Sequence, residues 1–237
     1  MVARRTIVPP RAPVRLRAVT RLLLASASPA RLATLAAAGI DALVCASGID
    51  EDAVLAAATG RFGALGPAAA VLVLAQATAQ WVAQRPHDDA DALLVLGCDS
   101  MLELGGEILG KPVDAADAVA RWRAMRGRSA TLHTGHWLID DRDPAVGGTG
   151  GTLGAASSTV VHFADLADAE IDAYVATGEP LAVAGAFTID GLGGPFVTRI
   201  EGDHHGVVGV SLPLLRELLG EIGVTIPDLW RPAGVVH

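Results

Sequence analysis

Short apolar runs alternate with helix-like segments along most of the chain, and this alternation restricts the fold more than any other feature. Unbroken apolar runs predict buried strands, whereas a 3.6-residue period bounded by Ser, Pro or Gly predicts helices. The sequence predicts strands at 22–25, 41–47, 93–97, 131–140 and 158–163, and helices at 29–38, 67–84, 115–125, 170–177 and 212–223. Strands that alternate with helices indicate the α/β class, and hairpins among them make the sheet mixed.

The stretch GCDSMLELGGEILGKP, residues 97–112, predicts a hairpin. Its Gly105-Gly106 pair suits a two-residue turn that folds SMLEL back onto EIL. The spacing of GGEILGK also fits a phosphate-binding P-loop. Pro112 stands where that loop needs a hydroxyl residue and a backbone donor, so we reject the P-loop.

Asp99 and Lys111 are the two residues of this hairpin that suit catalysis. Asp99 follows the apolar run 93–97, and ligands of open α/β sheets gather at such carboxyl ends. Lys111 is the only lysine among 18 basic residues, which favours a specific role over the alternative of a capping aspartate and a surface lysine. A two-residue turn pairs Lys111 with Ser100, so strict alternation aims it away from Asp99. We expect a bulge at Gly110 to correct its direction.

The segment SASPAR, residues 26–31, predicts an anion site where a strand passes into a helix. Unpaired N–H groups at a helix N-terminus attract phosphate. Ser26 and Ser28 add hydroxyl donors, and Arg31 adds a fixed cation. The alternative is ordinary helix capping by Ser28 with a solvated Arg31.

Charge and hydropathy exclude two classes of partner. The net charge of −8 argues against nucleic acid, whose phosphates need a basic surface. A nucleic-acid-binding module is therefore disfavoured. Mean hydropathy is +0.42, yet no apolar run reaches the roughly 18 to 20 residues that a membrane-spanning helix requires. We expect no membrane partner.

The ends and the cysteines predict a cytoplasmic protein without a targeting signal. Residues 1–20 are basic, and the LLLA that follows is far shorter than a signal-peptide core. We expect them to be a poorly ordered extension. Cys45 and Cys98 are too few for a disulfide framework and are expected to be buried thiols.

The glycine-rich stretch 184–209 allows close backbone approach to a ligand, although glycines also occur in plain turns. His204 and His205 suggest a metal site at first sight. Adjacent residues of a strand point to opposite faces, so we do not expect a histidine metal site there.

Four motifs in order resemble the Maf family of nucleoside triphosphate pyrophosphatases, once described as septum-formation inhibitors. The family motif S-x-S-P-R-R is matched by SASPAR, and A-D-T…G-E-I-L-G-K-P by CDS…GEILGKP. Its Y-V-A-S-G-E-P…A-G-A-Y-x-I-Q-G-L-G is matched by YVATGEP…AGAFTIDGLG, and V-V-G-L-P-L by VVGVSLPLL. The resemblance covers about residues 22–220.

The resemblance implies an enzyme that hydrolyses a nucleoside triphosphate to a monophosphate and pyrophosphate with a divalent cation, Mg²⁺ or Mn²⁺. It implies a fold like that of inosine triphosphatases, an elongated mixed sheet with flanking helices in two lobes around a cleft, formed here by residues 21–233. Asp99 matches the proposed general base, Glu51 its acidic partner and second metal ligand, and Lys111 the motif lysine. Ser26 and Arg31 match the phosphate-binding loop.

This chain departs from the family at five positions. The departures in the specificity motifs are Ala30, Ser100 and Asp190, so a dTTP or UTP preference is not carried over. Gln76, in LVLAQA, is assigned to the lysine of the family pattern L-A-x-x-K-A, and Gly206 to an asparagine.

The alternative function is a nucleotide-binding regulator of cell division with little catalysis, for which Gln76 is the best argument. Retention of Asp99, Glu51 and Lys111 together favours the enzyme. A homodimer is left open.

Overall fold

The computed structural model describes residues 20–86 and 93–230. The predicted N-terminal extension, apart from residue 20, and residues 231–233 of the predicted domain lie outside these ranges. The strands are β1 (Arg21–Ala25), β2 (Leu43–Val44), β3 (Leu93–Leu104), β4 (Glu107–Leu109), β5 (Ser129–Asp140), β6 (Thr152–Phe163) and β7 (Val197–Glu201). The helices are α1 (Pro29–Ala37), α2 (Glu51–Phe62), α3 (Pro67–Ala83), α4 (Ala115–Met125), α5 (Asp168–Ala176), α6 (His204–Val208) and α7 (Leu212–Glu221).

A seven-stranded mixed sheet forms the centre of the molecule, in the order β2-β1-β3-β5-β6-β7, with β4 attached to β3. Strands β2, β1 and β3 are parallel, and β3, β5, β6 and β7 pair antiparallel. This confirms the predicted α/β class with a mixed sheet. None of the helices in the described ranges has the length and apolar character needed to cross a membrane.

Strand β3 has an interrupted edge. One of its edges pairs continuously with β5 from Leu94 to Glu103. On the other edge β1 pairs only as far as Gly97, and β4 pairs only from Leu102 onward. Within the described ranges, residues 98–101 therefore have no strand beside them on that edge. The gap contains Asp99 and Ser100.

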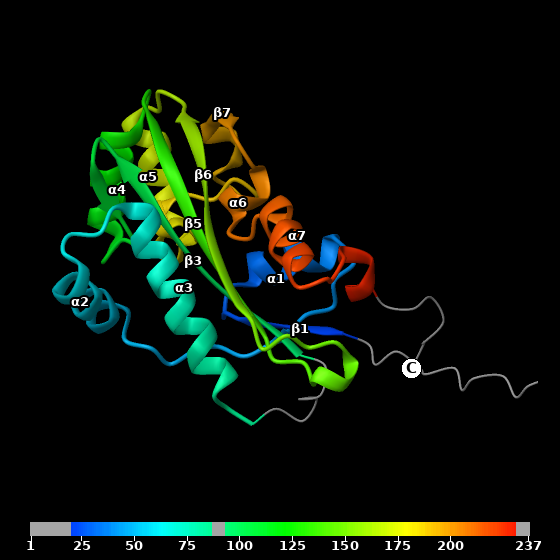
Figure 1. Ribbon diagram of the computed structural model, residues 1–237. Helices are drawn as coiled ribbons and strands as arrows, with labels where there is room; N and C mark the ends of the chain where they lie inside the picture. The colour runs from blue at the N-terminus through cyan, green and yellow to red at the C-terminus, as the bar shows by residue number, and fades with distance from the viewer. Residues whose placement is uncertain (1–19, 87–92, 231–237) are drawn as a thin grey trace, which may run out of the picture.

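Helix α3 lies directly on one face of the sheet (Figure 1). Two glycines allow this contact. A Cβ on Gly97 would lie 2.2 Å from the carbonyl oxygen of Ala75, and one on Gly135 would lie 2.3 Å from that of Val71. No side chain fits between helix and sheet at these positions, so the glycines fix the distance of α3 from β3 and β5.

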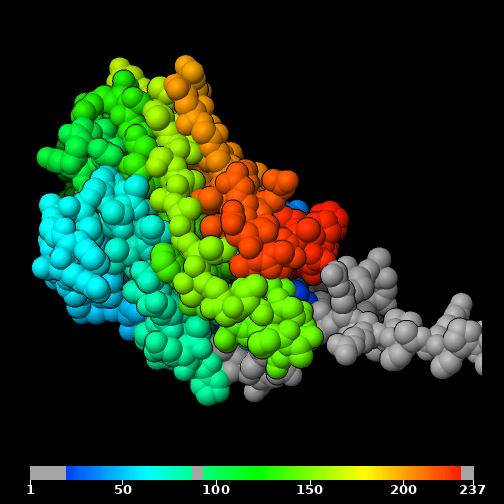
Figure 2. All heavy atoms as spheres, viewed as in Figure 1, coloured from blue at the N-terminus to red at the C-terminus, as the bar shows by residue number. Residues whose placement is uncertain are grey.

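The opposite face carries two separate hydrophobic clusters. One cluster joins α4 and α5 to the far ends of β3 and β5 around the fully buried Trp122. The other joins α1 and α7 to β1 and the near end of β3, with Leu35 and Leu219 fully buried. In the space-filling view α2 and α3 form a continuous surface on one side of β6, and α7 lies on the other side (Figure 2).

Several predictions about elements are wrong. Strand β7 and helix α6 were not expected, and His204 and His205, which were assigned to a strand, begin α6. Helix α2 was not expected, because its alanine-rich sequence has no clear apolar stripe. Asp50 caps it by accepting a hydrogen bond from the Ala53 N–H at 3.0 Å. Strand β2 is only two residues long, and β6 begins at Thr152 instead of at the predicted residue 158. There Thr149 donates two hydrogen bonds to Asp140, which fixes the turn before β6.

Candidate active site

A cavity of about 580 Å³ lies at the gap in the edge of β3. Its lining comes mainly from the β1–α1 loop, α2, β3, the segment after β4 and the segment 182–190. Further lining residues come from the segment after β2 and from α3, β5 and α6. All eight residues singled out from the sequence line it: Ser26, Ser28, Arg31, Glu51, Asp99, Ser100, Lys111 and Asp190. The fold thus brings together side chains that are far apart in the sequence.

Asp99 has an unusual environment for a carboxylate. Its Oδ2 atom is inaccessible to solvent and has no hydrogen-bond partner among the described residues. Burial raises the pKa of Asp99 to about 6, against the lowering effect of Arg31; Glu51 raises this pKa further, and Lys111 lowers it. A desolvated oxygen without a donor is a favourable position for a proton or a cation.

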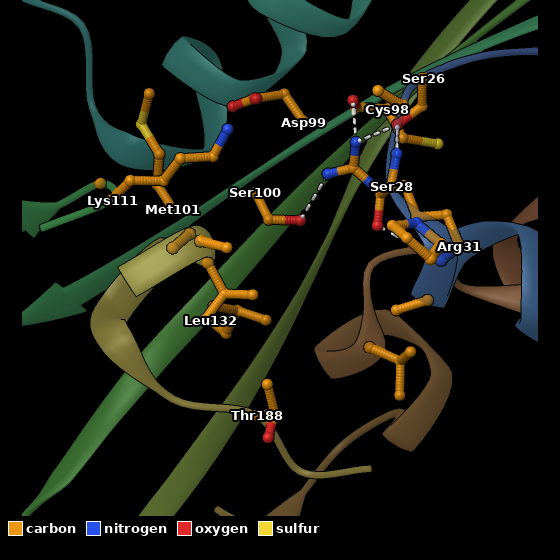
Figure 3. A pocket seen from close by; sticks show the side chains of 18 of the residues that line it. Ser26, Ser28, Arg31, Cys98, Asp99, Ser100, Met101, Lys111, Leu132 and Thr188 are labelled. Carbon is orange, nitrogen blue, oxygen red and sulfur yellow. Dashed lines mark hydrogen bonds between the residues drawn. The ribbon is translucent and has the colours of Figure 1, made fainter. Parts of the chain in front are cut away.

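Lys111 reaches the same side of the sheet as Asp99, with its amine directed toward the Asp99 carboxylate (Figure 3). The expected bulge at Gly110 is wrong. Strand β4 ends at Leu109 and its pairing with β3 is regular, so alternation no longer applies at Lys111. The Gly110 carbonyl accepts hydrogen bonds from Gly185 N–H at 3.0 Å and Arg121 at 2.6 Å, which fix the chain just before the lysine.

Arg31 is bound to the protein rather than solvated. Its guanidinium donates to the carbonyls of Gly209 at 3.1 Å and Cys98 at 2.7 Å, and to the hydroxyls of Ser26 at 3.0 Å and Ser100 at 3.3 Å (Figure 3). These bonds use all three of its nitrogen atoms. Arg31 therefore joins the loop of residues 26–28, called the serine loop below, to the gap in β3. Its positive charge remains close enough to the cavity to attract an anion there.

The serine loop has features of both interpretations of SASPAR, the anion site and the helix cap. Ser28 caps α1 by accepting a hydrogen bond from the Arg31 N–H at 3.4 Å. Ser26 is buried and accepts from the Ser28 N–H at 3.2 Å as well as from Arg31. Capping and the cavity wall are thus properties of the same loop, which presents the N-terminus of α1 to the cavity.

Ser100 and Asp190 lie at different depths of the cavity. The hydroxyl of Ser100 is 2.9 Å from that of Thr134, which donates to the Gly206 carbonyl at 2.8 Å. This chain of hydroxyls leads to Gly206 in α6. Asp190 is exposed and belongs to the segment 188–193.

The assignment of Gln76 to the family lysine is wrong by two residues. Counted from Leu74-Ala75, the fifth position of L-A-x-x-K-A is Thr78. Thr78 lines the cavity and is buried, whereas Gln76 is absent from the cavity wall. Residues two apart on a helix do not share a face, so only one of them can face the cavity. The position at which this chain lacks the lysine of the family pattern is therefore 78, where it has a threonine.

The cavity residues fit a divalent cation held jointly with a phosphate ligand. In the described part of the chain no group of three or more His, Cys, Asp and Glu side chains is close enough to hold a metal by itself, and this includes His204 and His205. Mg²⁺ is commonly held by only one or two carboxylates together with substrate phosphates. Asp99 and Glu51 supply two carboxylates in one cavity, and the unpaired Oδ2 of Asp99 suits such a ligand.

Sequence comparison agrees with this arrangement. The family of Maf-like proteins matches residues 21–222, which include every cavity residue discussed above. The chain belongs to the Maf family. This membership confirms the resemblance inferred from the four motifs.

Relatives in the Maf family match this chain over most of their own length. The nucleoside triphosphate pyrophosphatase of Streptomyces avermitilis is 52% identical over 212 residues, covering 90% of this chain and 95% of that protein. The protein of the same name from Salinispora tropica is 54% identical, covering 92% of this chain and 90% of that protein. The one from Rhodococcus jostii is 51% identical, covering 92% of this chain and 100% of that protein.

Sequence reasoning missed three residues that shape the site. Arg121 fixes the chain before Lys111, and its spacing from Asp117, with which it forms an ion pair at 2.7 Å, was the available signal. Thr78 was missed because the pattern L-A-x-x-K-A was aligned two residues too early, on Gln76. Glu179 was quoted within the motif YVATGEP, but its contacts depend on a segment that follows it and give no sequence signal.

Proposed function

We propose that this Maf-family protein hydrolyses nucleoside triphosphates to nucleoside monophosphates and pyrophosphate. The single observation that carries the proposal is the buried, unpaired oxygen of Asp99 in a cavity that also contains Lys111 and Glu51. Relatives about half identical over nearly the whole chain bear the name nucleoside triphosphate pyrophosphatase. The cavity volume of about 580 Å³ is in the range of small-molecule sites.

In the proposed reaction a water molecule attacks the α-phosphorus. Asp99 accepts a proton from this water, the new P–O bond forms, and the bond between the α-phosphorus and the bridging oxygen to the β-phosphate breaks. Pyrophosphate leaves with that oxygen. A general base with a pKa of about 6 can take up the proton near neutral pH. Lys111 offsets negative charge that develops on the phosphates.

Charge in the cavity supports a divalent cation as cofactor. The lining contains three carboxylates, Glu51, Asp99 and Asp190, against the cations Arg31 and Lys111. A triphosphate adds further negative charge. Mg²⁺ or Mn²⁺ held by Asp99 and Glu51 would supply Lewis-acid stabilisation of the phosphate oxygens.

The finer expectations belong to the proposal. We propose the cytoplasm as the compartment, supported by two free cysteines and by a substrate class typical of it. No nucleic-acid partner is proposed, because of the acidic net charge. A homodimer remains a prediction, to be measured by light scattering.

The test is a panel of canonical nucleoside and deoxynucleoside triphosphates incubated with the protein and Mg²⁺ or Mn²⁺, with all products separated. We expect monophosphate and pyrophosphate in equal amounts, with no diphosphate. Nucleotide binding without turnover would instead favour the regulator of cell division. The uncharged Thr78, at the position of the family lysine, replaces Gln76 as the argument for that alternative. Primary release of diphosphate and orthophosphate would contradict the proposed reaction.

A further inference from the structure

Glu179 binds the segment 188–193 from outside the cavity. Its carboxylate accepts hydrogen bonds from the backbone N–H groups of Leu192 at 2.9 Å and Gly193 at 3.1 Å. It also accepts from the hydroxyl of Tyr174 at 3.0 Å and from the hydroxyl of Thr188. One side chain therefore fixes both ends of the segment.

Tyr174 completes this arrangement. Its hydroxyl accepts a hydrogen bond from the Thr188 N–H at 3.2 Å and donates to Glu179. Its ring packs edge-on against Trp122 and Phe196 in the hydrophobic cluster below. The anchor for the segment is thus itself held by the core.

Two glycines allow the segment to approach this anchor closely. A Cβ on Gly191 would lie 2.7 Å from a carboxylate oxygen of Glu179, and one on Gly193 would lie 2.5 Å from the Tyr174 hydroxyl. Burial raises the pKa of Glu179, but hydrogen bonds from Thr188, Leu192 and Gly193 and from Tyr174 outweigh it and hold the pKa below its usual value. The carboxylate is therefore ionised at neutral pH, which strengthens the bonds it accepts.

The segment held in this way carries residues of the cavity wall. Thr188, Ile189 and Asp190 line the cavity, whereas Glu179 and Tyr174 are not among its lining residues. The catalytic candidates Asp99 and Lys111 belong to β3 and the chain after β4, which Glu179 does not contact through any hydrogen bond in the described residues.

We propose that Glu179 is a positioning residue for substrate recognition, which holds Asp190 and Thr188 in place against the substrate without touching it. The inference rests on the proposed function and extends it. An interaction that binds substrate and transition state equally changes KM rather than kcat. Loss of the anchor should therefore weaken substrate binding and reduce the discrimination between bases. The catalytic step at Asp99 should continue at nearly the same rate.

The test compares Glu179→Gln and Tyr174→Phe with the wild type on the nucleotide panel. The amide of Glu179→Gln places N–H donors opposite the backbone N–H donors, and Tyr174→Phe removes a single hydroxyl. We expect Glu179→Gln to raise KM about tenfold or more, a factor typical of losing a charge-assisted hydrogen bond, with kcat changed less than about threefold. The spread of kcat/KM between bases should narrow. Tyr174→Phe should act in the same direction with a smaller effect.

Glu170→Gln is the matched control. Glu170 accepts a hydrogen bond from the Ala167 N–H at 2.8 Å at the start of α5, so it is also a carboxylate that binds backbone, but it lies outside the cavity. We expect its KM and base preference to equal those of the wild type. A double variant of Glu179→Gln with Asp190→Asn should show the base preference of Glu179→Gln alone, because residue 190 no longer selects the base once its segment has lost the anchor.

The outcomes separate this inference from the proposed function. If the wild type hydrolyses no nucleotide, the proposed function fails. If the wild type is active but the Glu179→Gln and Tyr174→Phe variants lower kcat equally for all nucleotides at unchanged KM, Glu179 acts only on folding and the inference is wrong. If Glu179→Gln does not fold, unchanged KM and base preference in Tyr174→Phe alone overturn it.

Discussion

At the scale of single residues, Asp99 combines a functional advantage with a cost to stability. An ionised carboxylate oxygen without a hydrogen bond is unfavourable in a buried position, which is why its pKa is raised to about 6. We predict that Asp99→Asn lowers turnover by roughly 100-fold or more, as expected for a general base. The melting temperature should stay the same or rise, because the neutral amide avoids the cost of the buried charge. Steady-state kinetics and thermal unfolding at the same pH measure both.

The exposed Asp172 of α5 provides the control, since Asp172→Asn should change neither quantity. Near-normal turnover in Asp99→Asn would contradict the role of Asp99. A loss of turnover together with a lower melting temperature would attribute the defect to folding instead.

Asp190 is the residue through which we expect the base to be selected. An ionised aspartate only accepts hydrogen bonds, and uracil and thymine present two carbonyls around one N–H. Guanine presents adjacent N–H donors, and cytosine an amino group. We predict that dTTP and UTP are not strongly preferred, and that Asp190→Asn shifts kcat/KM toward them by about 5- to 150-fold. A wild-type preference for dTTP and UTP of more than about tenfold over all others would contradict this reading of the base.

At the scale of elements, buried His136 joins β5 to the start of α7. Its Nδ1–H donates to the Thr134 carbonyl at 3.1 Å, so its Nε2 is the acceptor of the Ser211 N–H at 2.8 Å. Burial lowers the pKa of His136 to about 4, and Arg31 lowers it further, against Thr134 and Asp203. Protonation would remove the acceptor that holds the N-cap of α7.

The sign of the resulting pH dependence follows from the lowered pKa. The unfolded chain takes up the proton near pH 6.5 and the folded chain only near pH 4, so stability is lost as pH falls through this window. We predict a loss on the order of 3 kcal/mol from His136 between these limits. Denaturant unfolding of the wild type and of His136→Gln measures it. Parallel stability curves of the two proteins from pH 7 to 4 would contradict the prediction.

Elements with strong local signals could be predicted from the sequence, and those fixed by contacts could not. The turn at Gly105-Gly106 and the start of α1 at Ser28-Pro29 depend on local backbone chemistry, and both were predicted. Helix α2 has only weak apolar periodicity, and the end of β4 at Leu109 depends on Arg121 and Gly185, which bind the next residue. Contacts between distant segments leave no local pattern to detect.

At the scale of the whole molecule, topology creates the site. Strands β1 and β4 approach the same edge of β3 from opposite ends, and within 20–86 and 93–230 no strand lies beside residues 98–101 on that edge. The motifs predicted which residues gather there, because each carries recognisable chemistry. They did not predict that Arg31 is bound to protein groups of distant segments, since hydrogen bonds to the carbonyls of Cys98 and Gly209 depend on the folded chain.

In the proposed reaction, this gap holds the α-phosphate of a nucleoside triphosphate for attack by water. The most direct measurement is hydrolysis in ¹⁸O-labelled water, with mass analysis of both products and Asp99→Asn as the inactive reference. We expect one ¹⁸O atom in the nucleoside monophosphate and none in the pyrophosphate. Label in the pyrophosphate, or in orthophosphate released alongside a diphosphate, would place the attack at another phosphorus and contradict the proposed reaction.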